Sequence, residues 1–325
     1  MAWPHRQDLY GNRLAPMQAA YAEVARAIAE FEPVNMVVHP DHAASARAQL
    51  GNAAQIVEVE INDSWMRDSG PTFIVDSDGK VGGVSWQFNA WGGKHSPWAA
   101  DDKLAQTLLA REGLDVRSSW LFCEGGSLAC DGEGTLIVTE TSILNPNRNP
   151  GVNKAFATAE LKAMLGVTKV IWLPGDPLDL ETDGHIDGMC CFVKPGVVLF
   201  ETNLDMTNPH ARILAENLNV LRSETDAKGR KLEIIPIVEA ANATATSEVF
   251  CRSYINFYLP NGGLVLPAYG IPEDSAALAV LARTFPDRRI VQVDVNAIAP
   301  GGGSIHCITQ EQPRQLQHVH GGQLP

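Results

Sequence analysis

A cysteine close to the end of the chain is preceded by residues that suit a reactive site. Cys307 follows the run Gly301-Gly302-Gly303 and the dipeptide Ile305-His306. Glycine reaches backbone conformations closed to other residues and lets a ligand approach closely, which a cysteine that only fills a core does not need. Upstream, Thr182-Asp183-Gly184-His185-Ile186-Asp187 pairs an imidazole with a carboxylate two positions on. One thiol, one imidazole and spare carboxylates favour nucleophilic catalysis by a Cys–His pair, with acids left to bind a cation.

The spacing of these residues predicts which side chains face the same ligand. His185 and Asp187 are two apart, and on an extended segment such residues point the same way. His306 is the direct neighbour of Cys307, and neighbours on an extended chain point to opposite faces, so we expect His306 to pack away from the pocket. A metal-binding His-x-Asp is the alternative interpretation. No third or fourth ligand has suitable spacing, so we expect no metal.

The composition argues against several classes of partner. The 325 residues carry a formal net charge of −13 without any cluster of Lys or Arg, which argues against nucleic acid or an anionic membrane. No apolar run is long enough to span a membrane, and the first residues do not form a secretory signal. The six cysteines include no CxxC pair, which indicates neither a zinc site nor a disulfide framework. We expect a cytoplasmic protein.

One supersecondary unit recurs along the chain without repeating its sequence: a β-hairpin, a helix and a lone strand. Turn residues predict the hairpins around 76–79, 131–134, 194–196 and 260–263, the last of them between strands at 254–258 and 264–267. Hydrophobic period predicts helices over 101–112, 153–165, 209–221 and 273–284, and lone strands over 116–122, 169–173, 232–237 and 290–295. Such a repeat is typical of closed, radially repeated architectures, whereas four hairpins fit the rival doubly wound parallel sheet poorly.

The first 61 residues predict a fifth unit that lacks part of its hairpin. We expect a strand at 1–3, a helix over 15–31 and strands at 35–38 and 56–61. The first strand of the hairpin is missing from this unit. The sheet is therefore expected to have an unpaired edge.

The candidate site residues fall at the same junction of each unit, between the lone strand and the next hairpin. Trp65-Met66-Arg67-Asp68 follows the first lone strand and Glu124-Gly125-Gly126 follows the second. The segment from Glu181 to Asp187 follows the third, and the segment that ends at Cys307 follows the last. Equivalent points of a closed repeat converge on one axis. The acids, the imidazole and the thiol are therefore expected to meet in one central pocket.

These junction motifs resemble those of the agmatine deiminase family, which belongs with the Porphyromonas-type peptidylarginine deiminases. The resemblance extends from Met1 to about Pro313, and residues 240–251 depart from the family pattern. The segments that carry it are Trp65-Met66-Arg67-Asp68-Ser69-Gly70-Pro71, Asn89-Ala90-Trp91-Gly92-Gly93-Lys94, Glu124-Gly125-Gly126-Ser127, Leu144-Asn145-Pro146-Asn147-Arg148-Asn149-Pro150, Thr182-Asp183-Gly184-His185-Ile186-Asp187 and Gly301-Gly302-Gly303-Ser304-Ile305-His306-Cys307.

The family resemblance implies an α/β fold, the five-bladed α/β propeller (pentein) of ββαβ-type repeats found in guanidine-modifying enzymes. It implies one catalytic domain over 1–313, with 314–325 expected to be a flexible C-terminal tail. Family members usually begin a couple of dozen residues earlier. The first blade is therefore expected to be incomplete at the N-terminus.

The resemblance also implies a role for each catalytic candidate. Cys307 would attack the guanidinium carbon, while His185 would move protons and Glu124 would orient His185. Asp68 and Asp187 would grip the planar guanidinium by forked, charge-assisted hydrogen bonds. The alternative interpretation of Cys307 is a core residue, and that of Asp68 is a turn residue.

Two further residues are candidates for substrate binding. Trp65 would form a pocket wall over the guanidinium or the methylene stem, and its alternative is a core tryptophan. Glu181 would meet the distal ammonium of the substrate, and its alternative is a solvated loop acid. The segment 145–150, with two Asn-Pro steps, is expected to build a rigid turn rather than touch substrate.

The expected activity is hydrolysis of agmatine to N-carbamoylputrescine and ammonia, by a hydrolase of C–N bonds in linear amidines that needs no cofactor. The alternatives keep a guanidine ligand: deimination of arginine, peptidyl arginine or another alkylguanidine, amidinotransfer, or non-catalytic guanidine binding. An α-carboxylate would require a positive partner in the pocket, and the sequence does not place Arg67, Arg148 or Arg252. A homo-oligomer is left open.

Overall fold

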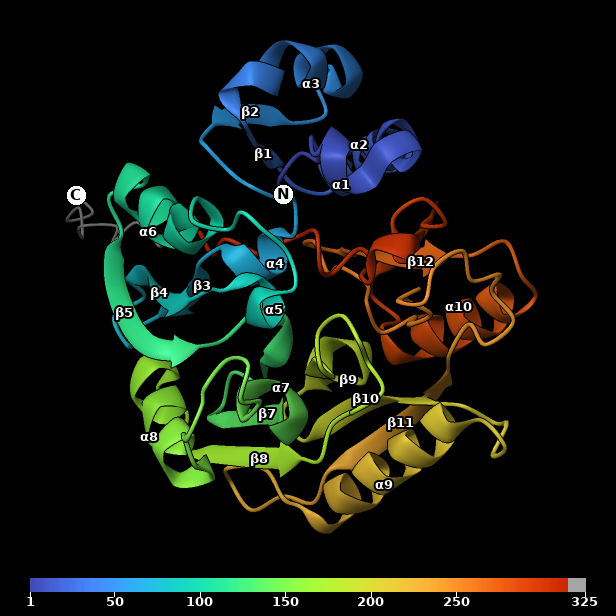
Figure 1. Ribbon diagram of the computed structural model, residues 1–325. Helices are drawn as coiled ribbons and strands as arrows, with labels where there is room; N and C mark the ends of the chain where they lie inside the picture. The colour runs from blue at the N-terminus through green and yellow to red at the C-terminus, as the bar shows by residue number, and fades with distance from the viewer. Residues whose placement is uncertain (315–325) are drawn as a thin grey trace, which may run out of the picture.

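The computed structural model describes residues 1–314, and its strands form five separate sheets. Figure 1 shows the sheets following one another around the molecule in chain order, with helices towards the outside. The tail expected at 314–325 lies, beyond Arg314, outside the described residues. No helix in the described part of the chain is both long and apolar enough to cross a membrane. The fold is therefore α/β.

Three of the sheets contain the predicted unit of hairpin, helix and lone strand. In each sheet the first two strands are antiparallel and the second and third are parallel. A helix connects each parallel pair. The strands are β3 (Thr72–Val75), β4 (Val81–Gln87) and β5 (Asp115–Phe122), then β6 (Ala129–Cys130), β7 (Thr135–Thr139) and β8 (Lys169–Leu173), then β9 (Cys190–Lys194), β10 (Val197–Thr202) and β11 (Glu233–Val238), with the helices α6 (Asp101–Arg111), α8 (Lys154–Leu165) and α9 (Pro209–Ser223).

Local chemistry explains where these elements begin and end. The side chain of Asn153 accepts a hydrogen bond from the Phe156 amide and caps α8, and Gly166 ends that helix in the left-handed conformation. Asn208 caps α9 in the same way, with Pro209 as the first helical residue. Every residue of the central strand β7 is buried, which explains its apolar run.

The last sheet has two strands, because one predicted strand is wrong. Strands β12 (Gly263–Ala268) and β13 (Arg289–Asp294) are parallel and are joined by α10 (Glu273–Thr284). Of the strand expected at 254–258, Tyr258 alone pairs, through a bridge to Val265. Tyr254 and Asn256 instead contact residues of other elements: the Tyr254 amide donates to Glu201, and the Asn256 side chain accepts from the Cys307 amide.

The first sheet consists of the parallel strands β1 (Asn35–Val38) and β2 (Gln55–Glu58). The strand expected at 1–3 is reduced to a bridge between Ala2 and Val37, with hydrogen bonds of 2.8 Å from the Trp3 amide to Val37 and from the Val37 amide to Met1. Strand β1 therefore has a partner on both sides. Ala2 and Trp3 are fully buried, so this segment is not the open edge that we expected.

Short elements make up the rest of the described chain. Helix α2 (Leu14–Ala29) packs against β12 and β13, and α3 (Ala43–Leu50), which the sequence analysis missed, joins β1 to β2. Short helices α4, η3, η4 and η5 follow the lone strands and hold the junction residues. The short elements are α1 (Gln7–Tyr10), η1 (Gly11–Arg13), η2 (Pro40–His42), α4 (Met66–Ser69), α5 (Ala90–Gly93), η3 (Gly125–Ser127), α7 (Glu140–Ile143), η4 (Ile186–Gly188) and η5 (Ala299–Gly301).

Candidate active site

The junctions that follow four different sheets meet around Gly126. A methyl group added at Gly126 would touch Nδ1 of His185 and would lie 3.0 Å from Oδ1 of Asp68 and 3.2 Å from Oδ2 of Asp187. The thiol of Cys307 lies 3.7 Å from the same Oδ2 of Asp187. The structure therefore brings the imidazole, two carboxylates and the thiol into one small volume.

His185 is buried among carboxylates. Its Nε2 donates to Oε2 of Glu124 at 3.3 Å, and its Nδ1 lies 3.9 Å from Oδ1 of Asp68. Burial alone would lower the pKa of His185, but the charges of Asp68, Glu124 and Asp187 outweigh it and raise the pKa to about 9. Nδ1 has no hydrogen-bond partner within residues 1–314. The Nδ1–H of the buried imidazolium therefore faces the site without a hydrogen-bond acceptor.

Glu124 is held from its other side by Arg148, which the sequence analysis missed. Nε of Arg148 donates to Oε1 of Glu124 at 3.0 Å, and the guanidinium also donates to the Thr182 carbonyl and to Asp183. Burial would raise the pKa of Glu124, but Arg148 and His185 lower it to about 2. The segment 145–150 was expected to be only a turn, yet it carries a fully buried cation that keeps Glu124 ionised.

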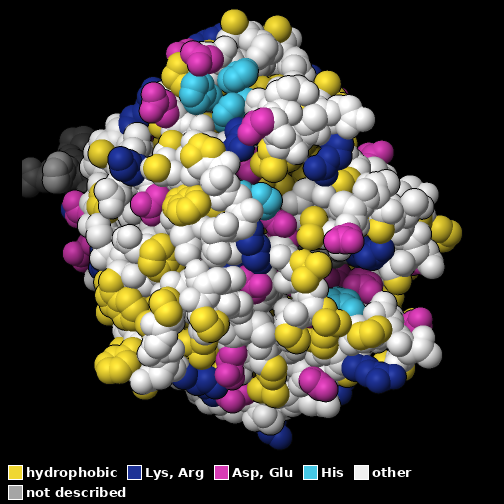
Figure 2. Space-filling model, in the orientation of Figure 1, with side chains coloured by type: hydrophobic (Ala, Val, Ile, Leu, Met, Phe, Trp, Pro, Cys, Tyr) yellow, Lys and Arg dark blue, Asp and Glu magenta, His cyan; other side chains and the backbone are white. Residues whose placement is uncertain are grey.

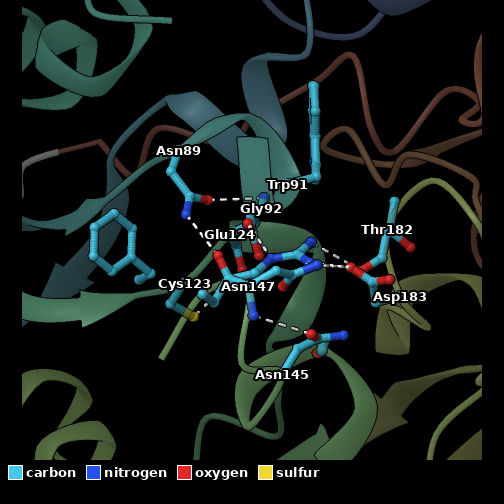
Figure 3. A network of polar contacts seen from close by, with 12 residues as sticks. Asn89, Trp91, Gly92, Cys123, Glu124, Asn145, Asn147, Thr182 and Asp183 are labelled. Atoms are coloured by element: carbon cyan, nitrogen blue, oxygen red, sulfur yellow. Dashed lines mark hydrogen bonds and ion pairs between the residues drawn. The ribbon is translucent and has the colours of Figure 1, made fainter. Parts of the chain in front are cut away.

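Arg148 donates to the Asn147 side chain at 2.9 Å, and Figure 3 shows the network of polar side chains to which Asn147 belongs. Asn89 donates to the carbonyl of Asn147 at 2.9 Å, and the Asn147 side chain donates to Asp183 at 3.0 Å. The Gly92 amide donates to the Asn89 side chain, which caps α5. A Cβ atom at Gly92 would clash with Asn147, so this close approach requires glycine there.

Asp68 is oriented by two donors. Nε1 of Trp91 donates to Oδ2 of Asp68 at 2.9 Å, and the Gly126 amide donates to Oδ1 at 2.9 Å. Burial raises the pKa of Asp68, although the charge of His185 opposes the shift. The Trp91 contact was not foreseen, although the sequence analysis singled out the segment that contains it.

Asp187 has an unforeseen partner in His306. Nδ1 of His306 donates to Oδ2 of Asp187 at 2.7 Å, so the expectation that His306 packs away from the site is wrong for this contact. Burial would raise the pKa of Asp187, but the hydrogen bond and charge of His306 lower it. The His306 ring is not in the cavity that contains Cys307. It lines a second cavity of about 710 Å³, which Asp187 also reaches.

The Cys307 thiol is buried beside two hydrogen-bond acceptors, the carboxylate of Asp187 and the side-chain carbonyl of Asn256. Burial, followed by the charges of Asp187 and Asp68, raises the pKa of Cys307 well above its usual range. The thiol and the backbone amide of Cys307 both donate to Oδ1 of Asn256 at 3.3 Å. Asn256 was not predicted, because it belongs to the segment that was expected to be a strand.

Trp65 packs against the glycine run that precedes the thiol. Its ring lies where a side chain at Gly301 or Gly303 would be, and a Cβ atom at Gly303 would also lie 3.0 Å from Sγ of Cys307. The glycines therefore allow the tryptophan and the thiol to approach each other. Trp65 is buried in the same apolar cluster as Cys307.

A cavity of about 390 Å³ opens from the thiol, and its lining includes His185, Asp187 and Cys307. Ala241 and residues 248–251 of the divergent segment, together with Arg252, line the same cavity. Glu181 does not: its carboxylate lies 2.6 Å from Nε2 of His95. Figure 2 shows acidic and histidine side chains grouped on this face, between the positions of β10 and α10 in Figure 1. Besides Asp187, five acids line the cavity: Asp176, Asp179, Glu201, Glu239 and Glu248.

Comparison with known proteins gives one consistent result. The family model of the Porphyromonas-type peptidyl-arginine deiminase matches residues 1–313. The agmatine deiminase of Pseudomonas aeruginosa is 42% identical over 96% of this chain and 92% of its own length, and that of Ectopseudomonas mendocina is equally similar. A solved structure of the agmatine deiminase of Enterococcus faecalis superposes with a TM-score of 0.94 at 34% identity, covering 97% of this chain and 93% of that one. The chain therefore belongs to the Porphyromonas-type peptidyl-arginine deiminase family.

Proposed function

We propose that this protein hydrolyses agmatine to N-carbamoylputrescine and ammonia through a covalent bond to Cys307. The observation that carries the proposal is the convergence of Cys307, His185, Asp68 and Asp187 around Gly126. It is supported by 42% identity, over 96% of this chain, to a relative named agmatine deiminase. The reaction requires no metal or cofactor in this proposal, and we assign it to the cytoplasm.

The substrate's charge activates the nucleophile. A guanidinium bound between Asp68 and Asp187 offsets the two carboxylates that raise the pKa of the Cys307 thiol. When the cation binds, the thiol releases its proton to solvent, and the thiolate attacks the guanidinium carbon. Two forked carboxylate contacts hold the planar group so that this carbon faces the sulfur.

His185 handles the protons of the next steps. As an imidazolium it protonates the departing amino group, and ammonia leaves a thiouronium bound to Cys307. The neutral imidazole then takes a proton from water, and the hydroxide attacks the same carbon. The added hydroxyl loses its proton to solvent as the C–S bond breaks, so that the ureido product forms and the thiolate is regenerated. Glu124, held by Arg148, keeps His185 oriented and basic.

Three further assignments complete the proposal. Trp65 forms a wall of the guanidinium site, beside the glycine run, and Glu181 attracts the distal ammonium through its charge. Residues 1–313 form one catalytic domain, a five-bladed α/β propeller in which each of the five sheets is a blade. The central pocket of that propeller is the site around Gly126.

The direct test is product analysis with the purified protein. Agmatine should yield ammonia and N-carbamoylputrescine, and 2-chloroacetamidine should label Cys307. The Cys307→Ser variant should lose turnover and labelling but keep the wild-type melting temperature. Cys130→Ser, which changes an exposed cysteine, is the matched control and should remain active. Normal ammonia release by Cys307→Ser would refute the assignment.

A further inference from the structure

Arg252 is a cation in the Cys307 cavity that lacks an acidic partner of the kind that Arg67 and Arg148 have. It lines the cavity together with Cys307 and His185, and its Nε is buried without a hydrogen-bond partner among the residues described. Arg148 is paired with Glu124, and Arg67 is paired with Glu311 outside this cavity. Of the three arginines that the sequence could not place, Arg252 is therefore the one that is available to a ligand in the Cys307 cavity.

The acids of the cavity have partners of their own. His210 bridges Asp176 at 2.7 Å and Glu239 at 3.3 Å, and Asn203 donates to Glu239. Asp179 accepts from the Glu181 amide at 3.0 Å, from the Gly184 amide at 3.0 Å and from the Thr182 hydroxyl.

Glu201 is a fully buried acid of the same lining. Burial, together with the charge of Glu239, raises its pKa well above the usual range, and the Tyr254 amide donates to it. Glu248 is the remaining acid of the lining. Four of these five acids thus have hydrogen-bond partners within the described residues, whereas the Nε of Arg252 has none.

A buried guanidinium N–H without a hydrogen-bond acceptor raises the free energy of the folded protein. Such a group therefore favours a ligand that accepts hydrogen bonds. A carboxylate is the best match, since it takes two parallel hydrogen bonds from the fork of an arginine. The centre of the Phe250 ring lies 5.7 Å from the Arg252 guanidinium carbon, within the range of a cation–π contact.

We propose that the enzyme has a second class of substrate, alkylguanidines whose tail ends in a carboxylate, and that Arg252 binds this carboxylate while Cys307 attacks the guanidinium. This inference rests on the proposed reaction at Cys307 but goes beyond agmatine. The covalent steps are the same as those above, because the tail takes no part in them. The enzyme then binds both ends of such a substrate. Asp68 and Asp187 bind its guanidinium, and Arg252 binds its carboxylate.

The test compares two guanidines that share a chain of four methylene groups, agmatine and 5-guanidinopentanoate. The wild type should release ammonia from both. Arg252→Met should lower kcat/KM for 5-guanidinopentanoate about 10- to 100-fold, mainly through KM, since a charge-assisted contact is lost. The same change should raise kcat/KM for agmatine, because a like charge facing the ammonium is removed. Arg252→Lys, which keeps the charge without the fork, should fall between.

The matched control is Arg283→Met, which removes an exposed arginine on α10 outside the cavity and should not lower activity towards 5-guanidinopentanoate. Labelling of Cys307 by 2-chloroacetamidine reports that each variant retains a folded site. The inference is overturned if the wild type turns over agmatine but not 5-guanidinopentanoate. It is also overturned if Arg252→Met lowers kcat/KM for both guanidines by one factor. A wild type that releases no ammonia from either compound would instead refute the proposed function.

Discussion

At the scale of single residues, His185 couples the chemistry of the site to the stability of the protein. Its pKa rises from the ordinary 6.5 to about 9 in the folded chain. Because the folded value is the higher one, the stabilisation is fully present below about pH 6.5 and is lost as the pH rises through 9. The shift corresponds to on the order of 3 kcal/mol of unfolding free energy.

His185→Asn should remove this dependence. The difference in unfolding free energy between wild type and variant should shrink by on the order of 3 kcal/mol from pH 6 to pH 10, measured by urea unfolding. His210, whose pKa of about 10 falls in the same range, is present in both proteins and cancels from the difference. A difference that stays constant over this range would show that His185 is not held as an imidazolium by its carboxylates.

At the scale of elements, the short helix η3 sets the dimensions of the site through Gly126. Gly126→Ala would push a methyl group into His185, Asp68 and Asp187, each held by its own partners. We expect kcat for agmatine to fall at least about 100-fold, because a displacement of about 1 Å is enough to misalign reacting groups. The measurement is steady-state ammonia release, with circular dichroism to check the fold.

The control for this prediction lies in the neighbouring helix η4. A methyl group at Gly188 meets no atom within 4 Å, so Gly188→Ala makes the same chemical change without a clash. It should retain most of the wild-type kcat. Equal losses in the two variants would mean that the position of Gly126 against the catalytic side chains is not what limits the reaction.

At the scale of the whole molecule, the first and last parts of the chain pack together beside the site. Glu32 accepts from the Tyr258 hydroxyl at 2.7 Å and from the Asn261 amide at 2.9 Å, and the ring of Phe31 lies against Gly263 at the start of β12. Figure 1 shows the blue N-terminal helices next to the orange C-terminal sheet. One apolar cluster includes residues of both parts together with Trp65 and Cys307.

Gly263→Ala should weaken the packing between the first and last parts of the chain. The new methyl group would lie 2.6 Å from the Phe31 ring, and overpacking of this kind costs about 1–3 kcal/mol of unfolding free energy. Glu30→Gln is the control at the same interface: it removes the ion pair to Arg289, in which both side chains are about half exposed, and should cost under about 1 kcal/mol. Urea unfolding of the two variants decides the prediction. A larger loss in Glu30→Gln would contradict it.

The sequence by itself determined the repeating unit and most of its boundaries. Helix α10 and strands β1 and β8 lie where turn residues and hydrophobic period predicted them, because those signals act within a few residues. The glycine run before Cys307 was likewise interpretable, since a close approach to Trp65 requires residues without side chains. Helix α3 was not predicted, because its buried side consists of Ala43, Ala46 and Leu50, which form a weak apolar pattern.

The partners of the catalytic candidates were decided only by the tertiary structure. Arg148 meets Glu124 from 24 positions away, Asn256 meets Cys307 from 51, and His306 meets Asp187 from 119. Local sequence sets backbone conformation, but burial lets a charge or an amide be satisfied by any group that folding brings near. The strand expected at 254–258 was lost for this reason, because Glu201 accepts from the Tyr254 amide and the His306 amide donates to the Asn256 carbonyl, so these backbone groups are not free for a sheet.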